Sequence, residues 1–143
     1  MKTSENGKNL IRNFEGLRLN AYKCPSGRLT IGYGHTAQVK ENDKITKEKA
    51  EEFLNNDIKI CENVLNKYCK VVLTQNQYDA CIDFIFNLGA GNFAKSTLLK
   101  LLNNKKFNEA ANQFERWILD SKNRPLEGLK RRRKVEKELF LKK

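Results

Sequence analysis

One glutamate, one cysteine and one threonine near the N-terminus could together carry out acid–base chemistry in one cleft. Glu15 is followed after eight residues by Cys24, and Cys24 after five more by Thr30. A tight turn predicted at residues 25–27, Pro-Ser-Gly, lets these distant side chains converge on one cleft. A carboxyl that faces a cleft, with polar groups opposite, is the minimum equipment for general-acid cleavage of a glycosidic bond.

Glu15 is the candidate acid, although a glutamate is far more often a solvated surface residue. Its neighbours Phe14 and Leu17 are apolar, and a glycine-bounded hairpin follows. These surroundings favour a partly buried position at the end of a first helix. There, both desolvation and the negative end of the helix dipole disfavour the anion, which favours the protonated carboxyl that a general acid needs.

The elements that must position these residues begin with a helix and a hairpin. Ser4 is a suitable N-cap for a helix over residues 4–14. Strands are predicted over residues 17–22 and 28–33, on either side of the turn. The polar residues 37–45 are expected to add a third short strand.

Helical periodicity dominates the rest of the chain. From Thr46 the apolar residues recur at helical spacing for about 22 residues, which predicts a long amphipathic helix able to bridge two lobes. A capping box at 74–77 starts a helix that is apolar on nearly every side and ends at Gly89, so this helix should be buried. Three further helices are predicted at 96–103, 107–120 and 128–141.

These elements predict the α+β class, with helices and strands segregated along the chain. A small antiparallel sheet lobe, about residues 15–45, is joined by the long helix to a mainly helical lobe formed by residues 46–143 together with 1–14. The length of 143 residues favours a single domain over 1–143.

The charge is strongly basic, at +11, and residues 130–143 carry eight basic and two acidic side chains. Such a surface attracts polyanions, whether nucleic acid, anionic lipid or bacterial envelope polymers. No recognisable nucleic-acid-binding module is present, which leaves a basic nucleic-acid-binding protein as the distant alternative. No transmembrane helix and no signal peptide are expected, so the protein should accumulate in the cytoplasm.

The cysteines and the single histidine are expected to have structural roles, and their spacing predicts no metal site. Cysteine spacing fits no zinc pattern, and Cys61 and Cys69 should be about 12 Å apart on one helix, too far for a disulfide. The cysteines other than Cys24 are expected to be reduced and apolar in character. An ion pair is predicted between His35 and Asp57, which would tie the sheet to the long helix.

Three segments resemble the phage-type lysozymes, the glycoside hydrolase family that contains many bacteriophage endolysins. Residues 15–36 resemble the catalytic hairpin of that family, residues 73–99 its central helix and following turn, and residues 124–141 its C-terminal block. The likeness covers nearly the whole chain in the right order, and the combination is far more specific than one short motif. The resemblance implies a lysozyme-like fold.

The resemblance also implies the activity of a muramidase, which cleaves the β-1,4 bond between N-acetylmuramic acid and N-acetylglucosamine in peptidoglycan. Glu15 would protonate the leaving oxygen, and Cys24 and Thr30, on the other side of the sugar, would position or activate water. Asn87 falls where family members line the cleft, although it is equally suited to end a helix. The other candidates for substrate contact are Tyr33, Gly34 and Arg132. No metal or cofactor is implied.

Cys24 departs from family members that have aspartate there, because an unperturbed thiol, with a pKa of about 8.5, is mostly protonated at neutral pH. Nearby Lys23 and Arg28 could favour a thiolate, the thiol could orient water together with Thr30, or Cys24 could attack as a nucleophile and change the stereochemical outcome. An inert hairpin cysteine is the fourth possibility. A lytic transglycosylase, which needs no water, is the alternative reaction.

The implied partners are peptidoglycan and the anionic bacterial envelope, without nucleic acid and without stable membrane insertion. Since peptidoglycan lies outside the membrane, the resemblance implies release from the host cytoplasm through a holin pore. The protein is expected to act as a monomer.

Overall fold

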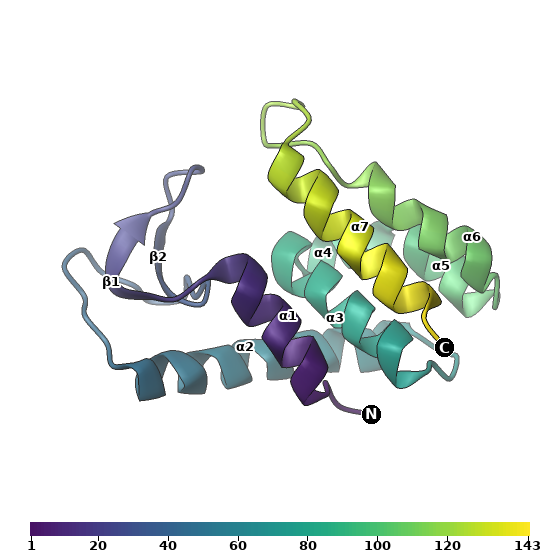
Figure 1. Ribbon diagram of the computed structural model, residues 1–143, viewed down its shortest axis with the longest axis horizontal. Coiled ribbons are helices and arrows are strands. Elements are labelled where there is room, and N and C mark those ends of the chain that lie inside the picture. The colour runs from purple at the N-terminus through teal and green to yellow at the C-terminus, as the bar shows by residue number, and fades with distance from the viewer.

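The computed structural model describes residues 1–143, most of which form helices, with a small hairpin at one end of the molecule (Figure 1). The helices are α1 (Glu5–Glu15), α2 (Lys47–Tyr68), α3 (Gln75–Leu88), α4 (Ala90–Lys95), α5 (Thr97–Asn103), α6 (Phe107–Gln113), the 3-10 turn η1 (Phe114–Arg116) and α7 (Glu127–Leu141). The strands are β1 (Arg18–Lys23) and β2 (Leu29–Gly32). The strands lie at one end of the molecule and α3 to α7 at the other, which confirms the segregated α+β arrangement.

The hairpin is a two-stranded antiparallel sheet in which Tyr22 pairs with Thr30. The predicted third strand is wrong: residues 37–45 contribute only the isolated bridge from Lys44 to Asn20. Gln38 and Asn42 adopt φ values of 57° and 69°. Such left-handed residues interrupt the extended backbone that a strand needs.

The long helix α2 connects the two ends of the molecule, as its periodicity predicted (Figure 1). Thr46 caps its start by accepting a hydrogen bond from the backbone N–H of Lys49. One face is buried along its length, through Ala50, Leu54, Ile58, Cys61 and Leu65. Contacts with β2 near its start and with α3 further along make α2 the support that both lobes share.

The capped helix α3 is the centre of the helical lobe, in contact with α1, α2, α4 and α7. Its capping box is formed by Thr74 and Gln77, and it ends at Gly89, which has a φ of 92°. Every α3 residue from Tyr78 to Ile85 is buried, and the ring of Phe84 meets Phe114 and Trp117 edge to face. All four cysteines are free.

Two helix predictions need correction beyond Gly89. The six-residue helix α4 was not predicted, because a short helix shows too little periodicity to be recognised. The helix expected over 107–120 gives way to η1 and ends at Arg116. The chain then forms a loop closed by a bridge between Leu119 and Pro125, inside which the Asp120 carboxylate accepts backbone hydrogen bonds. No helix is both long enough and apolar enough to cross a membrane.

Candidate active site

The Glu15 side chain lies where the end of α1 meets the hairpin and α7. It is the last residue of α1, its side chain is 18% exposed, and Oε2 accepts a hydrogen bond from Arg132 at 2.7 Å. The other oxygen, Oε1, faces Gly34: a Cβ added at Gly34 would lie 2.5 Å from it. Gly34 also has a φ of 71°, so only glycine lets the hairpin approach the carboxyl this closely.

Arg132 was expected to contact substrate, but the structure turns it inward. The residue is 5% exposed, and its guanidinium donates to both carboxylate oxygens of Asp83, at 2.9 and 2.8 Å, as well as to Glu15. It also lies over the ring of Phe14, with the guanidinium carbon 5.2 Å from the ring centroid. Arg132 therefore holds Glu15 in place, through an ion pair that the sequence analysis did not predict.

Asp83 is a functional candidate that the sequence reasoning missed. It lies on α3 with its side chain fully buried, and it anchors Arg132 from the side opposite Glu15. Burial alone would lower the pKa of Arg132, but the Asp83 and Glu15 carboxylates outweigh it and raise that pKa. The signal in the sequence was an aspartate at a core position of an otherwise apolar helix, because such a residue needs a buried partner.

Cys24 directly follows β1 and Thr30 lies on β2, both near the turn of the hairpin. The Cys24 sulfur is 2.9 Å from the hydroxyl oxygen of Ser26, and that hydrogen bond is the main cause that lowers the pKa of Cys24 to about 7. Hydrogen bonding, and not the cations of Lys23 and Arg28, therefore favours the thiolate. Thr30 is buried, and its Oγ1 donates to the carbonyl of Arg28 at 3.0 Å.

His35 and Asp57 are brought together, with Nδ1 of the imidazole 2.7 Å from Oδ2 of the carboxylate. The imidazole also stacks on Phe53 of α2, with ring centroids 4.1 Å apart. On the hairpin side, His35 and Ile31 exchange two backbone hydrogen bonds of 2.9 Å. These contacts fasten the end of the hairpin, and with it Gly34, to α2.

The other two candidates for substrate contact differ in how much surface they offer. Tyr33 belongs to the hydrophobic core and is 7% exposed, and burial is the main cause of its raised pKa. Tyr33 is therefore a packing residue. Asn87 is half-buried, and its Oδ1 accepts a hydrogen bond from Arg133 at 2.8 Å. This bond fixes the orientation of the Asn87 amide and leaves its NH₂ group without a partner in the protein.

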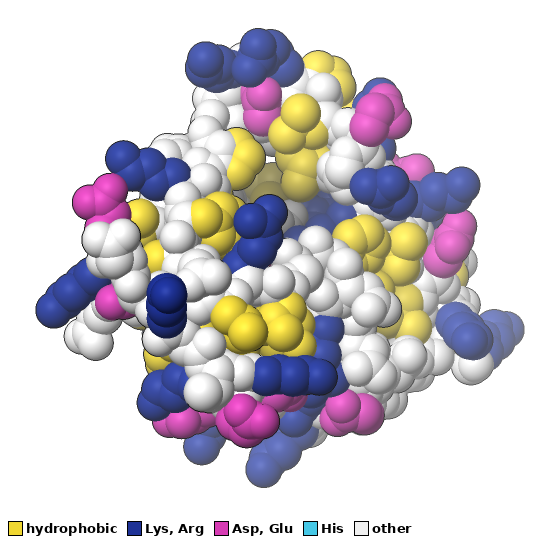
Figure 2. Space-filling view, turned by 60° about the vertical axis from the view of Figure 1, so that its left-hand side comes forward, with side chains coloured by type: hydrophobic (Ala, Val, Ile, Leu, Met, Phe, Trp, Pro, Cys, Tyr) yellow, Lys and Arg dark blue, Asp and Glu magenta, His cyan; other side chains and the backbone are white.

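Two hollows border the C-terminal end of α3. A pocket of about 290 Å³ is lined by Gly34 and Thr36 from the hairpin end and by Asp57, Ile85 and Phe86, among others, from α2 and α3. A second, of about 400 Å³, is lined by residues that include Leu88, Thr97, Gln113 and Trp117. Viewed with the hairpin end turned forward, the surface is hollowed near its centre, with hydrophobic and basic side chains in and around the hollow (Figure 2). Grooves of this size and mixed lining suit a saccharide chain.

No group of three or more His, Cys, Asp or Glu side chains is placed to hold a metal ion. The chemistry available at the site is that of the carboxyl, thiol and hydroxyl groups described above. The carboxyl group of Glu15 and the thiol of Cys24, whose pKa is lowered, are groups suited to acid–base catalysis.

Comparison with known proteins identifies the family. A family model described as phage lysozyme matches residues 12–136. The endolysin of Acyrthosiphon pisum secondary endosymbiont phage 1 is 48% identical over 143 residues, or 98% of each chain. The endolysin of Salmonella phage P22 is 40% identical over 146 residues, or 99% of each. Among solved structures, the muramidase domain of SpmX from Asticaccaulis excentricus has a TM-score of 0.93 and 39% identity, covering 99% of each chain.

A more distant relative bears a different description. The SAR-endolysin of Bacteriophage PS34 is 34% identical over 128 residues, which cover 89% of this chain and 76% of the relative. The predicted resemblance is confirmed by sequence and by structure alike. The chain belongs to the phage lysozyme family, and it is a lysozyme with the lysozyme-like fold of its structural neighbours.

Proposed function

We propose that this lysozyme is a phage endolysin that hydrolyses the β-1,4 bond between N-acetylmuramic acid and N-acetylglucosamine in peptidoglycan, with Glu15 as the general acid. The supporting observation is the convergence of three distant segments on one carboxyl. The end of α1 supplies Glu15, α7 supplies Arg132 at one oxygen, and the hairpin supplies Gly34 at the other. A carboxyl held this firmly can present its proton to a glycosidic oxygen in one orientation.

Water would be activated from the hairpin. Because the Thr30 hydroxyl gives its proton to the carbonyl of Arg28, its lone pairs are left to accept a hydrogen bond from water. With a pKa of about 7, about half of the Cys24 thiol is ionised at pH 7, so its thiolate can take the one proton that this water loses when it attacks. The Glu15 proton goes to the leaving oxygen, the water oxygen bonds to the anomeric carbon, and the configuration inverts.

The glycan chain would lie along the two hollows beside α3. Phe86 lines the pocket next to Gly34, and Trp117 lines the other, so each offers an aromatic surface to a sugar ring. Between them, the free NH₂ group of Asn87 is a hydrogen-bond donor for an acetamido or hydroxyl oxygen. Peptidoglycan is thus the substrate, and the envelope is the partner that the basic surface attracts.

The decisive experiment is digestion of purified peptidoglycan by wild type and by Glu15→Gln, with mass spectrometry of the products. Wild type should release fragments with reducing N-acetylmuramic acid ends, and Glu15→Gln should be at least about 100-fold slower. Glu41→Gln, an exposed hairpin-end glutamate, is the matched control and should digest normally. Full activity of Glu15→Gln would contradict the assignment of the acid. Products with 1,6-anhydromuramic acid ends would instead indicate a lytic transglycosylase.

Release from the host cytoplasm through a holin pore is the proposed route to the wall. Relatives named SAR-endolysin represent a different route, which would not depend on a holin. Expression in bacteria with and without a co-expressed holin separates the two. Lysis that requires the holin supports the proposal, and prompt lysis without it contradicts it. Glu15→Gln with the holin controls for damage by the pore alone.

A further inference from the structure

A buried charged cluster lies behind Glu15, between α3 and α7. Its members are Asp83, Arg132, Arg133 and Glu136, of which only Arg132 has any exposed side-chain surface, at 6%. Four ionisable side chains in an otherwise apolar interior are costly unless each is paired. A packing role would be filled better by apolar residues of the same volume, so the arrangement of the cluster needs another explanation.

Each arginine of the cluster is hydrogen-bonded to one candidate site residue, Arg132 to Glu15 and Arg133 to Asn87. Arg132 joins Asp83 to Glu15, as described above. Arg133 uses Nη2 for two hydrogen bonds, one to Asn87 at 2.8 Å and one to Oε2 of Glu136 at 2.9 Å, while its Nε lies 2.7 Å from Oε1 of Glu136. The adjacent arginines of α7 thus connect the interior to the general acid and to the amide of Asn87.

Glu136 links the two halves of the cluster, because its carboxyl is hydrogen-bonded to that of Asp83. Two carboxyl groups can share such a bond only if one of them carries a proton.

Glu136 is the carboxyl that holds this proton. Burial, together with the neighbouring Asp83, raises the pKa of Glu136 well above its ordinary value. Burial alone would also raise the pKa of Asp83, but the hydrogen bond from Glu136 and the charge of Arg132 lower it. The charged groups facing Glu136 are Asp83 from α3 and the two arginines of α7 itself.

We propose that Glu136 is a positioning residue of the active site, which acts through Asp83 and Arg132 on Glu15 and through Arg133 on Asn87. It touches no substrate. Its neutral carboxyl donates to Asp83 and accepts from Arg133, so that both arginines keep one orientation. The inference rests on the proposed function, because Glu15 matters only if it is the acid.

The test compares substitutions at Glu136 in the full-length enzyme. Glu136→Gln keeps a donor for Asp83 and an acceptor for Arg133, and it should retain kcat within about twofold of wild type. Glu136→Met has a similar length but no hydrogen-bonding group of this kind, and it should lower kcat at least about tenfold through misplacement of Glu15. Glu138→Gln, exposed on the same helix, makes the same change of charge and should behave as wild type. Near-UV circular dichroism and thermal unfolding establish that each variant is folded at the assay temperature.

A second variant covers the case in which Glu136→Met does not fold. In Arg133→Met/Glu136→Met the buried hydrogen-bonded pair of Arg133 and Glu136 is replaced by apolar groups, which folded proteins commonly tolerate. The same loss of kcat is expected, with normal thermal unfolding. Full activity of either folded apolar variant would overturn the inference, and so would a loss in Glu136→Gln as large as in Glu136→Met. Failure of the proposed function is recognised separately, by an active Glu15→Gln.

Discussion

At the scale of single residues, Cys24 offers a thiol where the proposed mechanism calls for a base. Its sulfur is hydrogen-bonded to the hydroxyl group of Ser26, and this bond is the main cause that lowers the pKa of the thiol to about 7. Such a thiol is both a usable base and a reactive nucleophile near neutral pH. The choice between a reactive and an inert hairpin cysteine therefore depends on one neighbouring hydroxyl group.

Alkylation with iodoacetamide should show this directly. The rate at Cys24, followed by peptide mass spectrometry, should rise with pH to half its maximum at about pH 7. Ser26→Ala should move that midpoint upward, because the hydrogen bond that stabilises the thiolate is lost. Ser121→Ala, a change in an exposed loop, should leave the midpoint unaltered. An equal midpoint in Ser26→Ala would show that another group sets the pKa of Cys24.

Gly34 gives a second prediction at this scale. Gly34→Ala should lower kcat by about tenfold or more, because its Cβ would lie 2.5 Å from Oε1 of Glu15 and force the acid or the hairpin to move. Gly27→Ala imposes comparable backbone strain, at a φ of 86°, but its Cβ meets nothing within 4 Å. That control should cost about 1 kcal/mol of stability and leave kcat nearly intact. Equal losses of kcat in both variants would mean that strain, and not the contact, matters.

At the scale of elements, the capping and stop residues in the sequence correctly predicted where the two main helices begin and end. Thr46, the capping box at Thr74 and the stop at Gly89 fix the ends of the two main helices through hydrogen bonds within a few residues. The contact of Arg132 with Glu15 spans 117 positions, and that with Asp83 spans 49. Helical and strand periodicity carries no information about side-chain pairs so far apart in the sequence. The sequence analysis therefore proposed Arg132 as a substrate contact, whereas in the structure it supports Glu15.

The attachment of the hairpin to α2 is an element-scale property that Asp57→Asn should weaken. Loss of the carboxylate leaves a weaker partner for the buried imidazole of His35, and the free energy of unfolding should fall by about 1–3 kcal/mol. Hydrogen exchange should accelerate first at the paired amides of Ile31 and His35. Glu52→Gln, which removes a surface pair with Lys49 on the same helix, should cost under about 1 kcal/mol. Uniform acceleration throughout the chain would contradict a local attachment.

The packing of α7 on α3 should depend on pH through Glu136. Because its folded-state pKa is raised above the ordinary value of 4.5, the folded protein binds a proton that the unfolded chain releases. The sign of this linkage makes stability fall as pH rises above about 4.5 toward the raised value. Denaturant unfolding across this range should show wild type losing stability relative to Glu136→Gln, which cannot titrate. Parallel stability curves for the two proteins would contradict a protonated Glu136.

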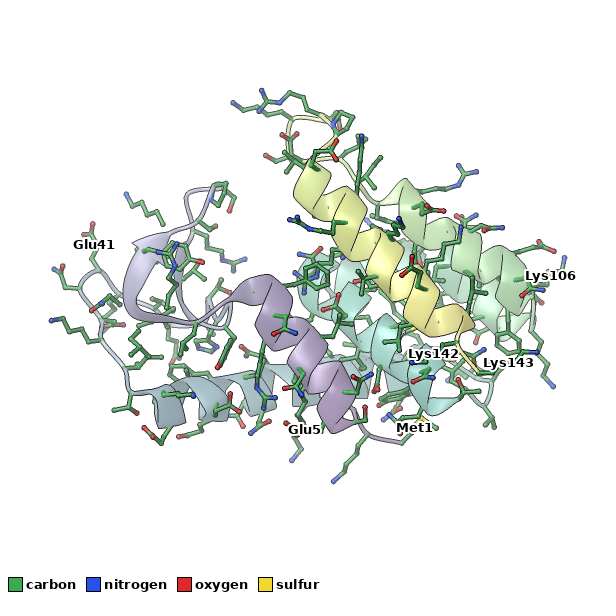
Figure 3. All side chains as sticks on the ribbon, in the orientation of Figure 1. Met1, Glu5, Glu41, Lys106, Lys142 and Lys143 are labelled. Atoms are coloured by element: carbon green, nitrogen blue, oxygen red, sulfur yellow. The ribbon has the colours of Figure 1, made fainter.

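At the scale of the whole molecule, we expect the positive surface charge to act in the approach to the wall and the active site to act in cleavage. The net charge of +11 is spread over the surface, and basic side chains project from many points of the hollowed face (Figure 2). Lys142 and Lys143 lie at the C-terminal end of the helical lobe, far from Glu41 beyond the hairpin (Figure 3). The C-terminus lies away from the hairpin-side end of α1, where Glu15 lies (Figure 1), so Lys142 and Lys143 can attract an anionic wall without taking part in cleavage.

Ionic strength should therefore affect the attraction of the enzyme to the wall but not the cleavage step. The rate of clearing a cell-wall suspension should fall several-fold as ionic strength rises, because screening shortens the reach of the positive surface to about 8 Å at physiological salt. Cleavage of a short, uncharged glycan fragment should change little over the same range. Lys142→Gln/Lys143→Gln should reduce the salt dependence on walls while leaving kcat on the fragment intact, because neither side chain is near Glu15. Equal salt sensitivity on both substrates would locate the effect in the cleavage step and not in the attraction to the wall.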